Sequence, residues 1–323
     1  MFTIDRKTEN GLNVIYLTDS TNNTSVGILP DHGALLHSFI IQANGKPLNM
    51  IDNYKDMDQL NQQFSRSYKS AKLSPFVCRT NKGKYMLDNT EYEFDNKFPD
   101  GSAIHGLIYN HRFTETEAFV NEQNACVTLS TRYEGHDKGY PFNYTCHVTY
   151  TLLPGSNLRV RTSVVNNSGS AIPIADGWHP YFTFGKSVDG LEIKFRAKEM
   201  LEFSDALIPT GKIMPREEFY DGTTLSDISL DNCFMLERMD DDEPACILSD
   251  PETGIALNIF AEKNYPFLQL YIPDDRQSIA IENLSGAPDC FNNRMGLMML
   301  APGETAEFAV RYQVGQPDNR RNG

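Results

Sequence analysis

Four short segments of the sequence combine titratable or hydrogen-bonding side chains with apolar or glycine neighbours. They are Cys78-Arg79-Thr80-Asn81-Lys82-Gly83, Ala103-Ile104-His105-Gly106, Gly177-Trp178-His179-Pro180-Tyr181-Phe182 and Ile279-Ala280-Ile281-Glu282-Asn283-Leu284-Ser285-Gly286. The sequence contains no G-x-G-x-x-G, P-loop, H-E-x-x-H or G-x-S-x-G motif, so nucleotide, zincin and serine-hydrolase chemistry lack motif support. Acid–base chemistry by a histidine and a carboxylate is the alternative that these segments offer.

Two of the titratable residues have mainly apolar or aromatic neighbours. His179 lies between the only tryptophan, Trp178, and a Pro-Tyr-Phe run, and rings such as Trp178 and Tyr181 can pack against the apolar face of a sugar. Glu282 follows the apolar run Ile279–Ile281, and a carboxylate at the end of a buried strand has a raised pKa suited to proton transfer. Taken alone, His179 also fits a core histidine and Glu282 a partly solvated strand end.

Four further residues could hold a polar ligand such as a sugar. His105 precedes Gly106, and glycine lets the backbone approach a ligand closely. Arg79 could donate a fork of hydrogen bonds to sugar hydroxyls, Asn81 lies in the same segment, and Asp231 could accept hydrogen bonds from those hydroxyls. Each of these residues alone also fits an ordinary surface position.

The framework that would position these residues is predicted to consist of β-strands. Apolar and polar residues alternate with a period of two over 144–152, and turn residues at 154–157 precede a second alternating run over 158–164, which predicts an antiparallel hairpin. Further strands are predicted at 125–133, 254–260, 267–272 and 308–314. Many short strands without a βαβ pattern indicate an all-β fold, a large antiparallel β-sandwich.

Only the stretch from Met57 to Ala71 has a helical pattern, with Leu60, Phe64 and Tyr68 four residues apart, and we expect a minor helix that covers the surface. The sequence has neither an internal repeat nor a Pro/Gly/Ser-rich linker. We therefore expect a single domain over residues 1–314, followed by a disordered tail over 315–323.

Composition excludes several classes of partner. The formal net charge of -14 opposes binding to a phosphate backbone or an anionic membrane. The N-terminus lacks the apolar core of a secretion signal and no later stretch is long enough to span a bilayer, so we expect a soluble, cytoplasmic protein. Six cysteines without a C-x-x-C pair indicate free buried thiols.

Taken together and in this order, these segments resemble the aldose 1-epimerase, or galactose mutarotase-like, family over roughly residues 33–303. The family's histidine-glycine, H-x-Y-F, Asp-x-x-Phe and late glutamate elements are similar to Ile104-His105-Gly106, His179-Pro180-Tyr181-Phe182, Asp231-Asn232-Cys233-Phe234 and Glu282 before Gly286-Ala287-Pro288-Asp289. The resemblance implies the mutarotase-like supersandwich fold and an isomerase that acts on a monosaccharide without metal or other cofactor, as a monomer or homodimer.

By this resemblance, Glu282 would be the base that removes the proton from the C1 hydroxyl, and His179 the acid that protonates the ring oxygen. The ring would open, C1 would rotate, and re-closure would give the other anomer, while His105, Arg79 and Asp231 held the sugar hydroxyls. Opening a hemiacetal independently requires one proton removed and another supplied in the same site.

The chain departs from the family pattern at two places. Where well-known members carry G-R-x-x-N-R, the segment 74–79 retains only the second arginine, Arg79, and a doubled glycine is reduced to Gly106-Leu107. Both changes bear on the substrate more than on the reaction. Three alternatives stay open: a hexose-6-phosphate 1-epimerase, a non-catalytic carbohydrate-binding protein, and a glycoside hydrolase that uses Asp231 and Glu282 as its two carboxylates.

Overall fold

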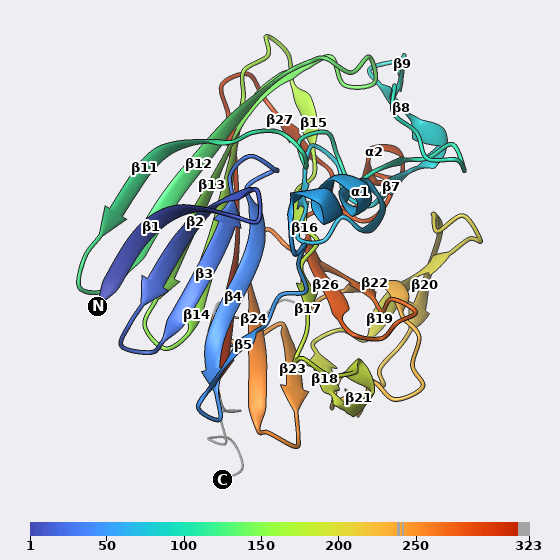
Figure 1. Ribbon diagram of the computed structural model, residues 1–323. Helices are drawn as coiled ribbons and strands as arrows, with labels where there is room; N and C mark the ends of the chain where they lie inside the picture. The colour runs from blue at the N-terminus through green and yellow to red at the C-terminus, as the bar shows by residue number, and fades with distance from the viewer. Residues whose placement is uncertain (238–239, 241, 316–323) are drawn as a thin grey trace.

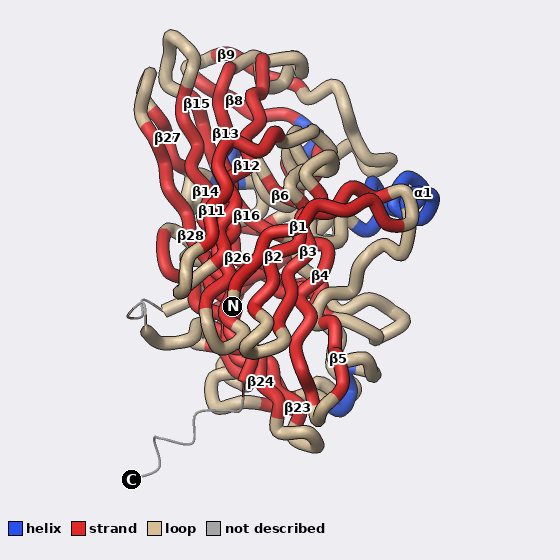
Figure 2. The backbone as a smooth tube through the Cα atoms, turned by 60° about the vertical axis from the view of Figure 1, so that its left-hand side comes forward, coloured by secondary structure: helices blue, strands red, loops and turns tan. Residues whose placement is uncertain are grey.

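Antiparallel strands make up most of the chain, which confirms the predicted all-β class and its sandwich architecture. The computed structural model describes residues 1–237, 240 and 242–315. Its largest sheets have nine, eight and five strands. The five-stranded sheet packs against the nine-stranded one, with β2 contacting β12 and β13 (Figures 1 and 2).

The nine-stranded sheet contains the predicted hairpin. Its strands, in spatial order, are β11 (Thr114–Val120), β12 (Ala125–Glu134), β13 (Asn143–Leu153), β14 (Asn157–Asn166), β28 (Thr305–Gly315), β24 (Ile255–Lys263), β23 (Cys246–Asp250), β18 (Glu192–Phe195) and β21 (Thr223–Thr224). In the hairpin Leu153 pairs with Asn157, and residues on β13 alternate between buried and half-buried, as predicted. Gly155 and Ser156 make the turn with positive φ angles.

The other two large sheets are built from shorter strands. The eight-stranded sheet consists of β20 (Pro209–Pro215), β19 (Glu199–Phe203), β22 (Asp231–Met235), β25 (Phe267–Tyr271), β26 (Ile279–Leu284), β16 (Gly177–Trp178) and β6 (Lys72–Leu73), with β17 (Tyr181–Phe182) also paired to β26. The five-stranded sheet consists of β1 (Phe2–Glu9), β2 (Leu12–Asp19), β3 (Thr24–Leu29), β4 (Leu35–Ala43) and β5 (Lys46–Asn49).

Small elements complete the described part of the chain. Three two-stranded sheets pair β10 (Ala103–Ile104) with β7 (Arg79–Thr80), β15 (Ile172–Ile174) with β27 (Met298–Leu300), and β8 (Lys84–Leu87) with β9 (Thr90–Glu93). The helical elements are α1 (Met57–Ser67), a single turn α2 (Cys290–Asn293), and two 3₁₀ turns, η1 (Asn81–Gly83) and η2 (Val188–Gly190). None of the described helices is long and apolar enough to cross a membrane.

Helix α1 is present but ends four residues before the predicted end at Ala71. Asp56 caps its N-terminus by accepting a hydrogen bond from the Gln59 N–H. Tyr68 adopts a left-handed conformation with φ 49° and donates its N–H to the Phe64 carbonyl, which ends the helix. The four-residue spacing continues through Tyr68 because that residue is also buried, so periodicity alone overran the boundary.

The cysteines and the C-terminus were the subject of two further predictions from the sequence. All six cysteines are free and buried, as predicted. The predicted disordered tail, 315–323, lies outside the described residues except for Gly315, which is the last residue of β28.

Candidate active site

One sheet carries most of the side chains that the sequence singled out. In the eight-stranded sheet, Asp231 lies on β22 and Glu282 on β26, with β25 between them. Gln269 on β25 pairs directly with Glu282. His179 lies between β16 and β17, which both pair with β26 through Gly177–Leu284 and Tyr181–Ala280. This register brings His179 alongside Glu282.

The side chains open into a cavity of about 220 Å³. Its floor comes from this sheet, and its walls come from the end of α1, the β7 and β10 segments and the loop after β19. The lining residues are Arg66, Ser67, Tyr68, Cys78, Arg79, Phe98, Ile104, His105, His179, Tyr181, Phe203, Leu207, Asp231, Gln269, Tyr271, Glu282 and Pro288.

His179 and Glu282 are in contact and almost completely buried. His179 Nε2 lies 3.4 Å from Glu282 Oε1, and the two side chains are 7% and 2% exposed. The imidazole stacks on the Tyr181 ring at 5.1 Å and meets the His105 ring edge-on at 4.8 Å. His179 Nδ1, His105 Nδ1 and Glu282 Oε2 have no hydrogen-bond partner among the described residues. Buried polar atoms without partners are costly, and a polar ligand in the cavity would satisfy them.

Burial shifts the pKa values of both groups toward their neutral forms. Desolvation raises the pKa of Glu282 well above its ordinary value, and the nearby Asp231 carboxylate raises it further. Desolvation lowers the pKa of His179 to about 4. Desolvation also lowers the pKa of His105, as do, to a smaller extent, the charges of His179 and Arg79. Over a wide pH range the His179–Glu282 pair therefore holds one dissociable proton, which either residue can carry.

Gln269 is a site residue that the sequence analysis missed. Its Nε2 donates a hydrogen bond to Asp231 Oδ1 at 2.8 Å, while its Oε1 is buried without a partner in the described chain. Burial raises the pKa of Asp231, and the Arg79 charge and this hydrogen bond oppose the increase. A polar residue in the middle of the apolar run Phe267–Tyr271 was the available signal.

Arg79 and His105 enter the cavity from the small sheet of β7 and β10. Ile104 pairs with Arg79, and the His105 N–H donates to the Cys78 carbonyl at 2.8 Å. Arg79 Nη1 donates to Asp100 Oδ2 at 2.5 Å and to the Ser102 hydroxyl at 2.9 Å, which orients the guanidinium. The sheet therefore holds the two side chains next to each other on one wall.

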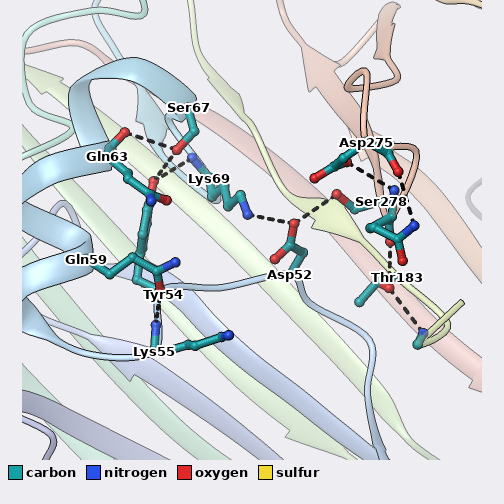
Figure 3. A network of polar contacts seen from close by, with 12 residues as sticks. Asp52, Tyr54, Lys55, Gln59, Gln63, Ser67, Lys69, Thr183, Asp275 and Ser278 are labelled. Atoms are coloured by element: carbon teal, nitrogen blue, oxygen red, sulfur yellow. Dashed lines mark hydrogen bonds and ion pairs between the residues drawn. The ribbon is translucent and has the colours of Figure 1, made fainter. Parts of the chain in front are cut away.

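The end of helix α1 supplies another wall, including Arg66, which the sequence analysis did not single out. Figure 3 shows the polar network that fixes this end of the helix. Lys69 Nζ lies 2.7 Å from Asp52 Oδ2, which also accepts a hydrogen bond from Ser278 Oγ at 2.9 Å. Tyr54 OH hydrogen-bonds to Ser67 Oγ at 2.9 Å. The network ties the helix to the residue that precedes β26, and thus to the strand that bears Glu282.

Two predicted ligand-binding residues do not line the cavity. Successive residues of a strand point to opposite faces, so Trp178 points away from His179, and its ring packs 4.5 Å from Lys72 Nζ. Asn81 is exposed, and its backbone makes local hydrogen bonds: its N–H donates to Asp289 Oδ1 at 2.9 Å, and its carbonyl accepts from the Lys84 N–H. The structure therefore gives no support to the sugar contacts predicted for the Trp178 and Asn81 side chains.

The same cluster could also hold a metal ion. One ligand atom each from His105, His179 and Glu282 lies within 4.8 Å of the others, and imidazole and carboxylate groups are zinc ligands. Proton transfer between Glu282 and His179 needs no metal, so a cofactor-free site stays the prediction.

Known proteins resemble this chain in sequence and in fold. The family model described as aldose 1-epimerase matches residues 15–313. The uncharacterised protein YihR of Escherichia coli K12 is 24% identical over 239 residues, which cover 72% of this chain and 74% of YihR. A galactose mutarotase-like protein from Clostridium acetobutylicum superposes with a TM-score of 0.87 at 18% identity, covering 98% of this chain and 99% of the other. A galactose 1-epimerase from Lactobacillus acidophilus gives 0.81 at 19%, with 98% and 99% covered.

Gly106 is expected to be irreplaceable in the loop that presents His105. Its φ is +78°, and a Cβ atom there would lie 2.3 Å from the Ser74 carbonyl oxygen. Gly106→Ala should lower the free energy of unfolding by about 2–4 kcal/mol, because it combines a left-handed backbone with an overlap against a fixed main chain. Urea denaturation measures this change. Gly155→Ala is the control for the cost of the left-handed backbone, because the Cβ atom there would meet nothing within 4 Å. An equal decrease in the free energy of unfolding in the two variants would contradict the predicted steric overlap at Gly106.

Proposed function

Because the chain belongs to the aldose 1-epimerase family, we propose that it interconverts the α and β anomers of a free aldose. The buried contact of 3.4 Å between His179 and Glu282 on the wall of a cavity carries this proposal. The cavity, at about 220 Å³, is smaller than the ~300–1,000 Å³ typical of sites for drug-sized ligands, and so suits a single sugar ring.

In the proposed reaction the pair acts in its carboxylate–imidazolium form, which is the minor arrangement of the shared proton because burial favours the neutral pair. Glu282 accepts the proton of the C1 hydroxyl while His179 donates a proton to the ring oxygen, so the C1–O5 bond breaks and C1 becomes a carbonyl carbon. Rotation about C1–C2 presents the other carbonyl face, and reversed transfers close the ring. The enzyme ends with the proton count with which it began, as an isomerisation requires.

The other cavity residues would hold the sugar during this rotation. Arg79 can donate and Asp231 can accept hydrogen bonds from hydroxyls, and His105 and Gln269 each have an unpartnered buried atom in the described chain. Tyr181, which stacks on His179, offers an aromatic edge to the sugar. Fixing the rest of the sugar while C1 turns favours re-closure inside the site.

Two observations favour this proposal over two of the alternatives, a hexose-6-phosphate 1-epimerase and a non-catalytic binding protein. A phosphate would need cations in the lining of the cavity, and Arg79 belongs to that lining, whereas Lys82, Lys84 and Arg276 do not. Lys84 is paired with Glu91 and Glu93, and Arg276 is bonded to Asp189 and two carbonyls. Among the described lining residues a phosphate would meet Arg66 and Arg79, of which Arg79 is already paired with Asp100, and it would also face the carboxyl groups of Asp231 and Glu282, which favours a neutral sugar. A non-catalytic binding protein would have no need of a buried acid–base pair.

Removing either proton-transfer group should abolish most of the rate. Glu282→Gln and His179→Asn should each slow anomer interconversion by about a hundredfold or more, because each variant keeps the shape of the site but loses one proton transfer. Polarimetry or exchange NMR on a panel of free and phosphorylated aldoses measures the rate. Glu91→Gln and His147→Asn, outside the cavity, are the matched controls and should keep the wild-type rate. Wild-type rates in both site variants would refute the proposed roles.

The rate should depend on pH through the shared proton. Below about pH 4, both groups are protonated and no base is left; above the raised pKa of Glu282, both are deprotonated and no acid is left. The profile of kcat/KM should therefore be a broad plateau through neutral pH with two falling limbs. Asp231→Asn should shift the alkaline limb to lower pH, since the Asp231 charge raises the Glu282 pKa. An alkaline limb at the same pH in this variant would contradict the assignment of that limb to Glu282.

A further inference from the structure

A fully buried ion pair lies within the eight-stranded sheet that bears the site, where β6 pairs with the residues just before His179. Lys72 Nζ lies 2.5 Å from Asp176 Oδ1, and both side chains are 0% exposed. Tyr265 OH donates to the same carboxylate oxygen at 2.7 Å, and Lys72 also donates to the Gly177 carbonyl at 3.2 Å. Burying two charges costs several kcal/mol per ion before their attraction is counted, so such a pair adds little stability relative to apolar residues of the same size. Stability alone therefore does not account for the pair.

The pair connects the strands on either side of His179. Lys72 and Leu73 of β6 pair with Trp178 and Gly177 of β16. Asp176 immediately precedes β16 and exchanges two hydrogen bonds with Ser285, at the end of β26: the Asp176 N–H donates to Ser285 Oγ, and the Ser285 N–H donates to the Asp176 carbonyl, both at 2.8 Å. Lys72 and Asp176 thus join β6 to β16 next to the strand that carries Glu282.

The backbone of His179 depends on this pairing. Its N–H donates to the Ala71 carbonyl at 3.1 Å, and its carbonyl accepts from the Ser70 N–H at 2.8 Å. Because β6 and β16 are only two residues long, their ladder alone specifies the register weakly. A slip by one residue would turn the imidazole away from the cavity, and Lys72, whose ammonium also lies 4.5 Å from the Trp178 ring centre, opposes such a slip.

We propose that the Lys72–Asp176–Tyr265 cluster is a positioning device that fixes the β6–β16 register and thereby holds the His179 imidazole against Glu282. None of the three residues lines the cavity in the described chain, so they act through His179 and not on the sugar. The inference rests on the proposed proton-transfer role of His179. A single buried polar group that fixes register at the expense of stability is a well-attested use of such groups in other proteins.

The test removes both charges together, since removal of one alone would leave the other buried and unpaired. We expect the double variant Lys72→Met/Asp176→Leu to fold. Its kcat should fall tenfold or more, because the His179 imidazole is no longer held against Glu282. Its KM should change less than threefold, because the residues that contact the sugar are unchanged. Tyr265→Phe is a milder variant, expected to lose about threefold in kcat. Tyr140→Phe is its control, because this variant also removes a buried hydroxyl, in this case one that donates to the Pro173 carbonyl at 2.8 Å.

A second readout does not depend on activity. The His179 ring signal, assigned in a histidine-labelled NMR spectrum with His179→Asn, should change its shift and its titration midpoint in the double variant and in Tyr265→Phe, but not in Tyr140→Phe. Unchanged His179 signals, or unchanged kcat in an active protein, would overturn the positioning role. A wild-type protein without epimerase activity would refute the proposed function, and the NMR comparison would still decide whether the cluster positions His179.

Discussion

The site depends on the burial of a carboxyl and an imidazole in contact with each other. Water would stabilise the charged form of either group, and its exclusion moves the two pKa values in opposite directions, upward for Glu282 and downward for His179. The pair consequently keeps a single proton that can move between two nearby atoms. Without burial, the carboxyl would be ionised at neutral pH and the imidazole would titrate separately, and the proposed acid and base would no longer be coupled.

Such burial requires a rigid surrounding, and the eight-stranded sheet provides it. Glu282 lies on a strand whose six residues are all buried, flanked by β25 on one side and by β16 and β17 on the other. His179 comes from an interruption between two of the shortest strands, where backbone pairing is weakest. The buried ion pair and the hydrogen bonds to Ser70 and Ala71 lie at this interruption. The additional polar contacts therefore occur where the backbone hydrogen bonds of the sheet constrain a side chain least.

Similarity to solved structures extends over nearly the whole chain, although identity with them is only 18–19% in the cases compared. At that identity the likeness describes the fold, and the substrate must be argued from the cavity. Its lining includes Cys78 beside Arg79, and Arg66 from the end of α1. One domain, a cytoplasmic location and a monomeric or homodimeric state stay predictions.

The sequence by itself determined the strand pattern and the helix near residue 60, because alternation and helical spacing are local properties. The sequence singled out His179 and Glu282 through their apolar neighbours and the family resemblance, and the roles of these two residues stay predictions. The sequence also has limits. It did not determine which face each side chain would take in a two-residue strand, and so it included Trp178, which points away from the cavity. Nor could it find Gln269 as a partner of Asp231 or join Lys72 to Asp176, 104 residues apart. Only the tertiary structure decided these contacts, because strand register brings together residues whose separation in sequence carries no periodic signal.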